Sequence, residues 1–187
     1  MPGLRVIAGK AKGRRLAMVP GCGTRPISDR AKEALFNILG PDVAGSHFLD
    51  LFAGTGSVGI EALSRGAARV VFIDSNPRAV RTIHENLHRV GLEQGAEVLR
   101  ADAFVYLNQT TPTRFDYVYI APPQYQGAWL RALQTIDTQP GWLNPDAWVV
   151  AQIDPTEYQS PTLERLVEFD QRRYGTTLLC FYELPGE

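Results

Sequence analysis

The chain has few cysteines and histidines, no long apolar run and almost no net charge. Its 187 residues include two cysteines, Cys22 and Cys180, near opposite ends of the chain, and no CxxC or CxxxH spacing occurs. We therefore expect neither a disulfide framework nor a structural zinc site. No apolar run is long enough to span a membrane, and the opening residues are too polar and glycine-rich for a signal peptide. These absences predict a soluble protein of the reducing cytoplasm.

The composition is that of an ordinary globular protein, with 44% hydrophobic and 21% charged residues. A chain of this length buries enough surface in a single core to fold without cross-links. We expect one domain with a small appendage. His84 and His88 have the i, i+4 spacing of a metal pair, but no third ligand is recognisable, so we expect no metal and read both as solvated.

The charge is distributed unevenly along the chain. Residues 1–36 hold eight of the 19 basic residues but only two of the 20 acidic ones. A basic arm on an acidic body is typical of an appendage that binds a polyanion, although a solvated hairpin is the alternative. The candidates for contact with RNA or DNA are Lys10, Lys12, Arg14, Arg15, Arg25 and Arg30.

The first 40 residues predict a hairpin followed by a helix. Residues 4–8 and 14–19 have the pattern of two short strands around a turn flanked by glycines, which would place lysines at its tip. Ser28 can cap a helix over residues 29–39, which Gly40 and Pro41 end. We therefore divide the chain into residues 1–40, a basic hairpin and helix that we expect to bind a nucleic acid, and residues 41–187, the main domain.

The remaining chain alternates between apolar strands and amphipathic helices. Strands that are apolar throughout, separated by helices, indicate a parallel sheet covered on both faces, a doubly wound α/β fold. Two further segments, 163–169 and 172–183, predict an antiparallel hairpin that closes the sheet. The predicted strands are 47–52, 69–74, 96–99, 115–120 and 147–153, and the predicted helices are 58–64, 77–90, 103–107 and 126–136.

A glycine loop follows the first predicted strand. Gly54, Gly56 and Gly59 satisfy GxGxxG between a strand and a helix, and Asp74 ends the next strand where an acid that binds ribose belongs. This motif alone fits a dinucleotide or S-adenosylmethionine, because both ligands place an adenosine across the same crevice. Asp50 favours S-adenosylmethionine, because a fixed carboxylate repels the pyrophosphate of a dinucleotide but suits the ammonium and the sulfonium of S-adenosylmethionine. A nicotinamide dehydrogenase is accordingly the weaker reading.

Asp102 and a proline pair follow the next two strands. Asp102 comes after strand 96–99 and could reach an adenine amino group, or could equally cap the following helix. Strand 115–120 leads into Ala121-Pro122-Pro123-Gln124-Tyr125. Two prolines fix a rigid turn with free carbonyls, which suits an amine acceptor held in line for methyl transfer, and an aromatic residue beside them would stack on the base. The plainer alternative is a turn that merely ends a strand.

Together these segments resemble a known family. RVIAGKAKGRRL, RPISDRAKEALFNIL, FLDLFAGTGSVGIEALSRGA, VFIDSNPRAV and a proline pair after the fourth strand are similar to the RsmD family over nearly the whole chain. These enzymes methylate the exocyclic N2 of a guanine in small-subunit (16S) ribosomal RNA with S-adenosylmethionine. The resemblance implies a Rossmann-like, seven-stranded methyltransferase fold with an N-terminal β-hairpin extension, acting as a monomer on ribosomal RNA within the assembled 30S subunit.

The resemblance also implies roles for individual residues. Residues 50–56 would line the methionine end of the cofactor. Asp74 would bind the ribose and Asp102 the adenine. The predicted cofactor-binding residues are Asp50, Phe52, Ala53, Gly54, Thr55, Gly56, Asp74, Ser75, Asp102 and Ala103. The predicted catalytic residues are Pro122, Pro123, Gln124 and Tyr125.

Two positions depart from the family pattern. The family has Asp-Pro-Pro followed by Tyr or Phe, whereas this chain has Ala121 in place of the acid and Gln124 in place of the aromatic residue. One acceptor for the guanine amine is therefore missing, and the Pro122 carbonyl, Gln124 and Tyr125 remain. Two alternatives stay open: a catalytically weak RNA-binding protein on this scaffold, and a methyltransferase acting on a protein glutamine or a small molecule.

Overall fold

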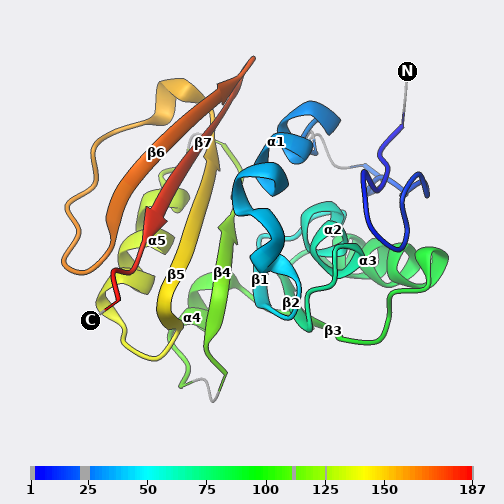
Figure 1. Ribbon diagram of the computed structural model, residues 1–187, viewed down its shortest axis with the longest axis horizontal. Coiled ribbons are helices and arrows are strands. Elements are labelled where there is room, and N and C mark those ends of the chain that lie inside the picture. The colour runs from blue at the N-terminus through cyan, green and yellow to red at the C-terminus, as the bar shows by residue number, and fades with distance from the viewer. Residues whose placement is uncertain (1–2, 22–25, 111–112, 125, 187) are drawn as a thin grey trace.

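The computed structural model describes residues 3–21, 26–110, 113–124 and 126–186 (Figure 1). Within these residues seven strands form one sheet in the order β3-β2-β1-β4-β5-β7-β6. The strands are β1 His47–Leu51, β2 Arg69–Asp74, β3 Ala96–Arg100, β4 Phe115–Ile120, β5 Leu143–Ile153, β6 Val167–Tyr174 and β7 Thr177–Glu183. The helices are α1 Asp29–Leu39, α2 Ser57–Ser64, α3 Pro77–Val90, α4 Ala103–Leu107 and α5 Ala128–Thr138, with short 3-10 turns at Gly40–Val43 and Pro155–Glu157.

The strand directions confirm the doubly wound sheet. Strands β1 to β5 pair in parallel, while β7 pairs antiparallel with both β5 and β6. All five parallel strands therefore end at one edge of the sheet. Ligands of open α/β sheets bind outside that edge, near the point where the strand order reverses, which is between β1 and β4 here.

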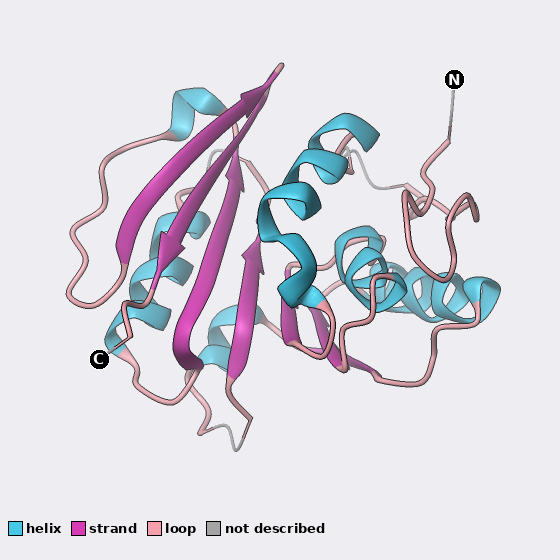
Figure 2. Ribbon diagram, in the orientation of Figure 1, coloured by secondary structure: helices cyan, strands magenta, loops and turns pink. Residues whose placement is uncertain are grey.

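Two cores lie on the two faces of the sheet. Along β4, Tyr117 and Tyr119 point into the core beneath α1, α2 and α3, whereas Val118 and Ile120 point into the core beneath α4 and α5. Figure 2 shows α1 crossing one face of the sheet, with α5 on the other. No helix among the described residues has the length and apolarity needed to cross a membrane.

The helix boundaries follow local chemistry. Ser28 caps α1 by accepting from the Ala31 N–H at 3.2 Å, as predicted. Asn76 caps α3 in the same way and Pro77 occupies its first turn. Helix α5 begins at Ala128, later than predicted, because Gly127 has a left-handed backbone with φ 65°.

The predicted hairpin in the arm is present in a reduced form. Residues 3–21, here called the arm, fold back so that the Leu16 N–H donates to the Leu4 carbonyl, but Arg5 and Arg15 make its one isolated bridge within the described residues. The Ile7 and Ala8 N–H groups donate to Glu61 on α2 instead of to a partner strand. Because these backbone groups bond to the body, the arm does not form two regular strands.

The last two strands are also displaced from their predicted bounds. Residues 163–166 precede β6, because the carboxylate of Asp137 accepts the backbone N–H groups of Glu164, Arg165 and Leu166. Arg172 and Arg173, predicted to begin the final strand, belong to β6. The turn falls at Gly175, whose φ is 59°, between the paired residues Tyr174 and Thr177.

Candidate functional site

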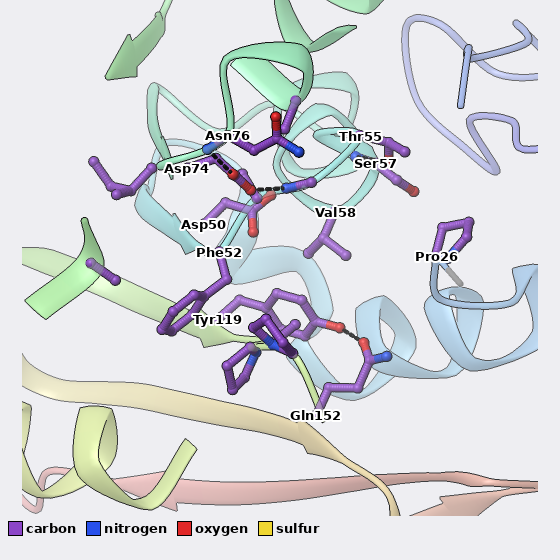
Figure 3. Close-up of a pocket in the computed structure, with 18 of the residues that line it drawn as sticks. Pro26, Asp50, Phe52, Thr55, Ser57, Val58, Asp74, Asn76, Tyr119 and Gln152 are labelled. Carbon is purple, nitrogen blue, oxygen red and sulfur yellow. Dashed lines mark hydrogen bonds between the residues drawn. The ribbon is translucent and has the colours of Figure 1, made fainter. Parts of the chain in front are cut away.

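A pocket of about 310 Å³ opens at the carboxyl edge of the parallel strands (Figure 3). The end predicted to hold the cofactor, here called the cofactor end, is formed by the loops after β1, β2 and β3. The end predicted to hold the methyl acceptor, here called the acceptor end, is formed by the loop after β4 together with β5 and β7. Nine predicted cofactor-binding residues line it: Asp50, Phe52, Ala53, Gly54, Thr55, Asp74, Ser75, Asp102 and Ala103. The sequence motifs on three separate strands therefore meet around one cavity.

The three glycines of the loop have different roles. Gly54 lines the pocket with φ 58°, a conformation that side chains disfavour. Gly56 lies outside the lining set: it precedes α2 with φ 80°, and a Cβ there would come within 3.2 Å of Ile83 Cγ1. A Cβ on Gly59 would lie 2.3 Å from a ring carbon of Phe72, so this glycine lets α2 pack on β2.

Asp74 is held by the backbone of two loops. Its Oδ2 accepts from the Gly54 N–H and its Oδ1 from the Asn76 N–H, both at 2.9 Å. Each carboxylate oxygen has a second lone pair, so the group can still accept hydrogen bonds from a pair of hydroxyls. Figure 3 shows Asp74 beside the glycine loop, at the wall of the cavity.

Asp50 lies deeper, with 1% of its surface exposed. Its Oδ2 accepts from the Gly59 N–H at 3.0 Å. Burial is the main cause that raises the pKa of Asp50 to about 8; the Gly59 hydrogen bond opposes this shift and nearby Asp74 adds to it. The carboxyl therefore tends to keep its proton near neutral pH, and a cation in the pocket would favour its ionised form.

Asp102 makes the predicted helix cap, and its predicted contact with an adenine stays a prediction. It lines the pocket and also caps α4, where its Oδ1 accepts from the Phe104 N–H at 2.9 Å and the Val105 N–H at 3.0 Å. Both of these bonds use one oxygen of the carboxylate. The cap thereby fixes the side chain at the pocket rim without excluding contact with a ligand.

The acceptor end contains the proline loop. Ala121, Pro122, Pro123 and Gln124 line the pocket, whereas Tyr125 lies outside the described residues. Tyr119 of β4 and Gln152 of β5 also line it, and the Tyr119 hydroxyl donates to Gln152 Oε1. Sequence reasoning missed both residues: Tyr119 looks like a core residue of an apolar strand, and the one available signal was the polar amide of Gln152 within the apolar run 147–153.

The arm and the segment after it contribute a wall that was not predicted. Met18, Val19, Pro26 and Ile27 line the pocket. These are apolar residues without a motif, so only the fold brings them to the site. Arg25, a predicted RNA-binding residue, lies outside the described residues.

A buried cluster of charges holds the arm on α2. The Glu61 carboxylate accepts from the Ile7 N–H at 2.8 Å and the Ala8 N–H at 3.0 Å, and lies 3.4 Å from Lys32 Nζ. Lys32 and Glu61 side chains are both fully buried, and Lys32 Nζ also donates to the Arg5 carbonyl at 2.6 Å. Burial lowers the pKa of Lys32, which Glu61 opposes. The arm is thus fixed to the body through groups that water does not reach.

Asn86 of α3 makes a second link. Its Oδ1 accepts from the Ala17 N–H at 2.7 Å, and its Nδ2 donates to the Ala17 and Thr55 carbonyls, each at 3.0 Å. The side chain is fully buried. One amide therefore joins the arm to the glycine loop.

The predicted RNA-binding residues that the structure describes lie outside the pocket. Among those described, none is a lining residue, and all are exposed: Lys10, Lys12, Arg14, Arg15 and Arg30. Arg14 donates to the Arg89 carbonyl at 2.5 Å, and the Arg30 guanidinium carbon lies 5.9 Å from the centre of the Tyr174 ring. Across the part of the chain that the structure covers, no cluster of three or more His, Cys, Asp or Glu residues could hold a metal.

Known proteins share this sequence and fold. Residues 4–183 match the family profile described as "Conserved hypothetical protein 95". Ribosomal RNA small subunit methyltransferase D from Haemophilus influenzae is 35% identical over 86% of this chain and 82% of its own length. The chain belongs to the RsmD family. The resemblance predicted from the sequence motifs is confirmed.

A further sequence relative and a solved structure agree with this assignment to the RsmD family. A Bacillus subtilis protein named "Putative rRNA methyltransferase YlbH" is 38% identical over 98% of this chain and 100% of its own length. The solved structure of "Putative methyltransferase yhhF" from Escherichia coli superposes with a TM-score of 0.87 at 27% identity and covers 100% of both chains. The seven-stranded methyltransferase fold is therefore the fold of this chain.

Proposed function

We propose that this protein transfers a methyl group from S-adenosylmethionine to the exocyclic N2 of a guanine in small-subunit ribosomal RNA. The observation that carries the proposal is that one pocket is lined by three strand-end acids at one end and by the proline loop at the other. The acids are Asp50, Asp74 and Asp102. The relatives named as ribosomal RNA methyltransferases support this substrate class.

The cofactor end fits S-adenosylmethionine by its donor set. Asp50 is a buried carboxyl whose ionised form a cation would favour, as the ammonium of the methionine moiety requires. Asp74 offers two acceptor oxygens to the ribose hydroxyls, and Gly54 allows close approach of the backbone. When bound, the cofactor supplies a methyl group on a positively charged sulfur, ready for displacement.

The acceptor end must hold an amine and let it lose a proton. We assign the Pro122 carbonyl and the Gln124 amide oxygen as acceptors for the N2 hydrogens, since both residues line the pocket and Ala121 has no acceptor. We assign Tyr125 to stacking on the base. Holding the amine in line with the methyl carbon is the main contribution that the protein makes to such a displacement. The base must leave its stack to reach this loop.

The arm, together with residues up to the first turn of α1, is the part of the chain that grips the substrate backbone in this proposal. We assign phosphate contacts to Lys10, Lys12, Arg14, Arg15 and Arg30, which are exposed, and to Arg25. Residues 1–40 would then bind RNA while residues 41–187 carry out transfer. We further propose that a cytoplasmic monomer acts on the RNA within the assembled subunit.

The direct test is transfer of labelled methyl from S-adenosylmethionine to small ribosomal subunits that lack their native methylation, followed by nuclease mapping. We expect one modified guanine, and methylation of naked ribosomal RNA is measured in parallel. Transfer to several nucleotides, or to a base other than guanine, would contradict the proposal. Steep salt dependence of subunit binding would separate an RNA substrate from a protein or small-molecule one.

Ala121 favours one second candidate, a catalytically weak RNA-binding protein. Its support is that the acid of the family pattern is replaced at a residue that lines the pocket. Absence of methyl transfer, together with measurable binding of both cofactor and subunits, would establish this candidate instead.

A further inference from the structure

The acceptor end of the pocket contains a polar pair that the methyl transfer proposed above does not use. Tyr119 and Gln152 lie on neighbouring strands, with Tyr119 paired to Asp50 on one side and to Val150 on the other. The line from Asp50 through Tyr119 to Gln152 thus crosses β1, β4 and β5 along the pocket floor (Figure 3). Apart from this pair, the floor here is apolar, because Ala121 and Ile153 flank Gln152.

The hydroxyl of Tyr119 sets the orientation of the Gln152 amide. Tyr119 is 3% exposed, and burial together with the nearby Asp50 carboxyl raises the pKa of its phenol well above the ordinary value, so the group stays protonated. Its O–H donates to Gln152 Oε1. The amide nitrogen therefore points away from the phenol ring, as Figure 3 shows.

This amide is next to the position where the family acid is missing. The register pairs Ile120 with Ala151, so the following residues, Ala121 and Gln152, sit side by side at the ends of β4 and β5. Ala121 begins the proline loop that receives the target amine. A base whose amine reaches Pro122 must present the rest of that edge to Gln152.

We propose that Gln152 reads the Watson–Crick edge of the target guanine, with Tyr119 as the positioning residue. The amide oxygen accepts from guanine N1–H with the lone pair that Tyr119 leaves, and the amide nitrogen donates to guanine O6. This contact rests on the proposed function, because it requires a guanine whose N2 is methylated. It assigns specificity to a residue outside the proline loop.

The amide pattern discriminates between bases that carry the same reactive amine. The analogue 2,6-diaminopurine keeps the N2 amine but has an acceptor at N1 and a donor at position 6, the reverse of guanine. Opposite Gln152 it would leave donors facing donors and acceptors facing acceptors. Sites built to hydrogen-bond one pattern reject a base that lacks it, and a bidentate contact discriminates by about 5- to 150-fold.

The test compares two target bases in otherwise identical substrates. Small subunits are reconstituted with RNA that carries guanine or 2,6-diaminopurine at the nucleotide that the wild type modifies, and kcat/KM is measured for each. The wild type should prefer guanine by about 5- to 150-fold. Gln152→Met, which keeps the volume without the amide, should bring the ratio close to one.

Two variants and one titration keep the result interpretable. Tyr119→Phe should lower the preference partly, because the amide then rotates freely. Gln94→Met, at an exposed site between α3 and β3, is the matched control and should keep the wild-type ratio. Cofactor affinity measured for every variant reports whether its fold is intact.

The inference is overturned if the wild type shows no preference between the two bases, or if Gln152→Met keeps the preference while binding cofactor as the wild type does. Failure of the wild type to methylate guanine at all would instead overturn the proposed function, and this inference with it. The two failures are therefore distinguishable in one experiment.

Discussion

The two ends of the pocket are built by different means. At the cofactor end, carboxylates are fixed by backbone N–H groups of short loops, as Asp74 is by Gly54 and Asn76. At the acceptor end, the defining contact joins the side chains of Tyr119 and Gln152, which are 33 residues apart. A site made from loop backbone leaves a local motif in the sequence, whereas a site made from side chains of separate strands leaves none.

The first prediction concerns the wall that the arm contributes to the pocket. Glu61→Ala should lower the free energy of unfolding by about 3–5 kcal/mol, because it leaves Lys32 buried without its partner and strands the Ile7 and Ala8 N–H groups. Urea unfolding measures the change. Glu85→Ala, at an exposed site on α3, is the control and should change stability by less than about 0.5 kcal/mol. Equal effects of the two variants would show that the buried cluster does not hold the arm.

The second prediction gives the acceptor end the acid it lacks. Ala121→Asp adds an acceptor at the proline loop and should raise kcat for methyl transfer about a hundredfold, an effect of about 2–4 kcal/mol on the barrier. Cofactor affinity should stay the same, since Ala121 lies at the other end of the pocket. Ala121→Val, which adds bulk without an acceptor, should give no gain. An unchanged rate in Ala121→Asp would mean that Gln124 and Pro122 already supply what the amine needs.

The third prediction addresses the cofactor end alone. Asp74→Ala should weaken S-adenosylmethionine binding by about 1.5–3 kcal/mol, because hydrogen bonds to a charged group are lost. Calorimetric titration measures the affinity, and subunit binding should not change. Asp42→Ala, at an exposed site before β1, serves as the control. A loss of RNA affinity equal to the loss of cofactor affinity would argue against separate ends.

The fourth prediction uses pH to distinguish the two ends. The pKa of Asp50 is raised to about 8, so the empty pocket holds a proton that a cationic cofactor must displace. Affinity for S-adenosylmethionine should therefore rise with pH, by up to about tenfold per unit between about pH 5.5 and about pH 7.5, below the titration of the cofactor's own amine. Asp50→Asn should flatten this dependence. A slope equal in both proteins would assign the proton to another group.

The same pKa has a consequence for the stability of the empty protein. The folded state binds a proton at Asp50 between about pH 4 and about pH 8, where the unfolded chain has released it. Stability should consequently fall as pH rises through this window, and Asp50→Asn should remove that contribution. Thermal unfolding of both proteins across the window measures the difference.

Most of the fold could be predicted because local signals agree with the packing. The bounds of α1, α3, α4, β2 and β4 match the prediction from hydrophobic periodicity and caps. The end of the chain was harder to predict: Asp137 binds the backbone of residues 164–166 from a distant helix, and the turn at Gly175 follows two arginines that belong to the strand before it. Such contacts between segments far apart in sequence leave no local pattern.

The candidate site divides in the same way. Asp50, Asp74 and Asp102 could be found because each follows a predicted strand, and parallel strands end together. Met18, Val19 and the Tyr119–Gln152 pair could not, since their side chains reach the pocket only once the arm has folded onto α2 and β4 has paired with β5.

The buried Asn86 limits which changes in the arm and the glycine loop the fold can accept. Its amide accepts one hydrogen bond from the arm and donates two, one to the arm and one to the glycine loop. An aspartate at this position could not donate either bond, and a leucine could make none of the three. Insertions in the arm must likewise preserve the position of Ala17, and changes in the glycine loop the position of Thr55. The three hydrogen bonds of Asn86 therefore constrain the lengths of the two segments together.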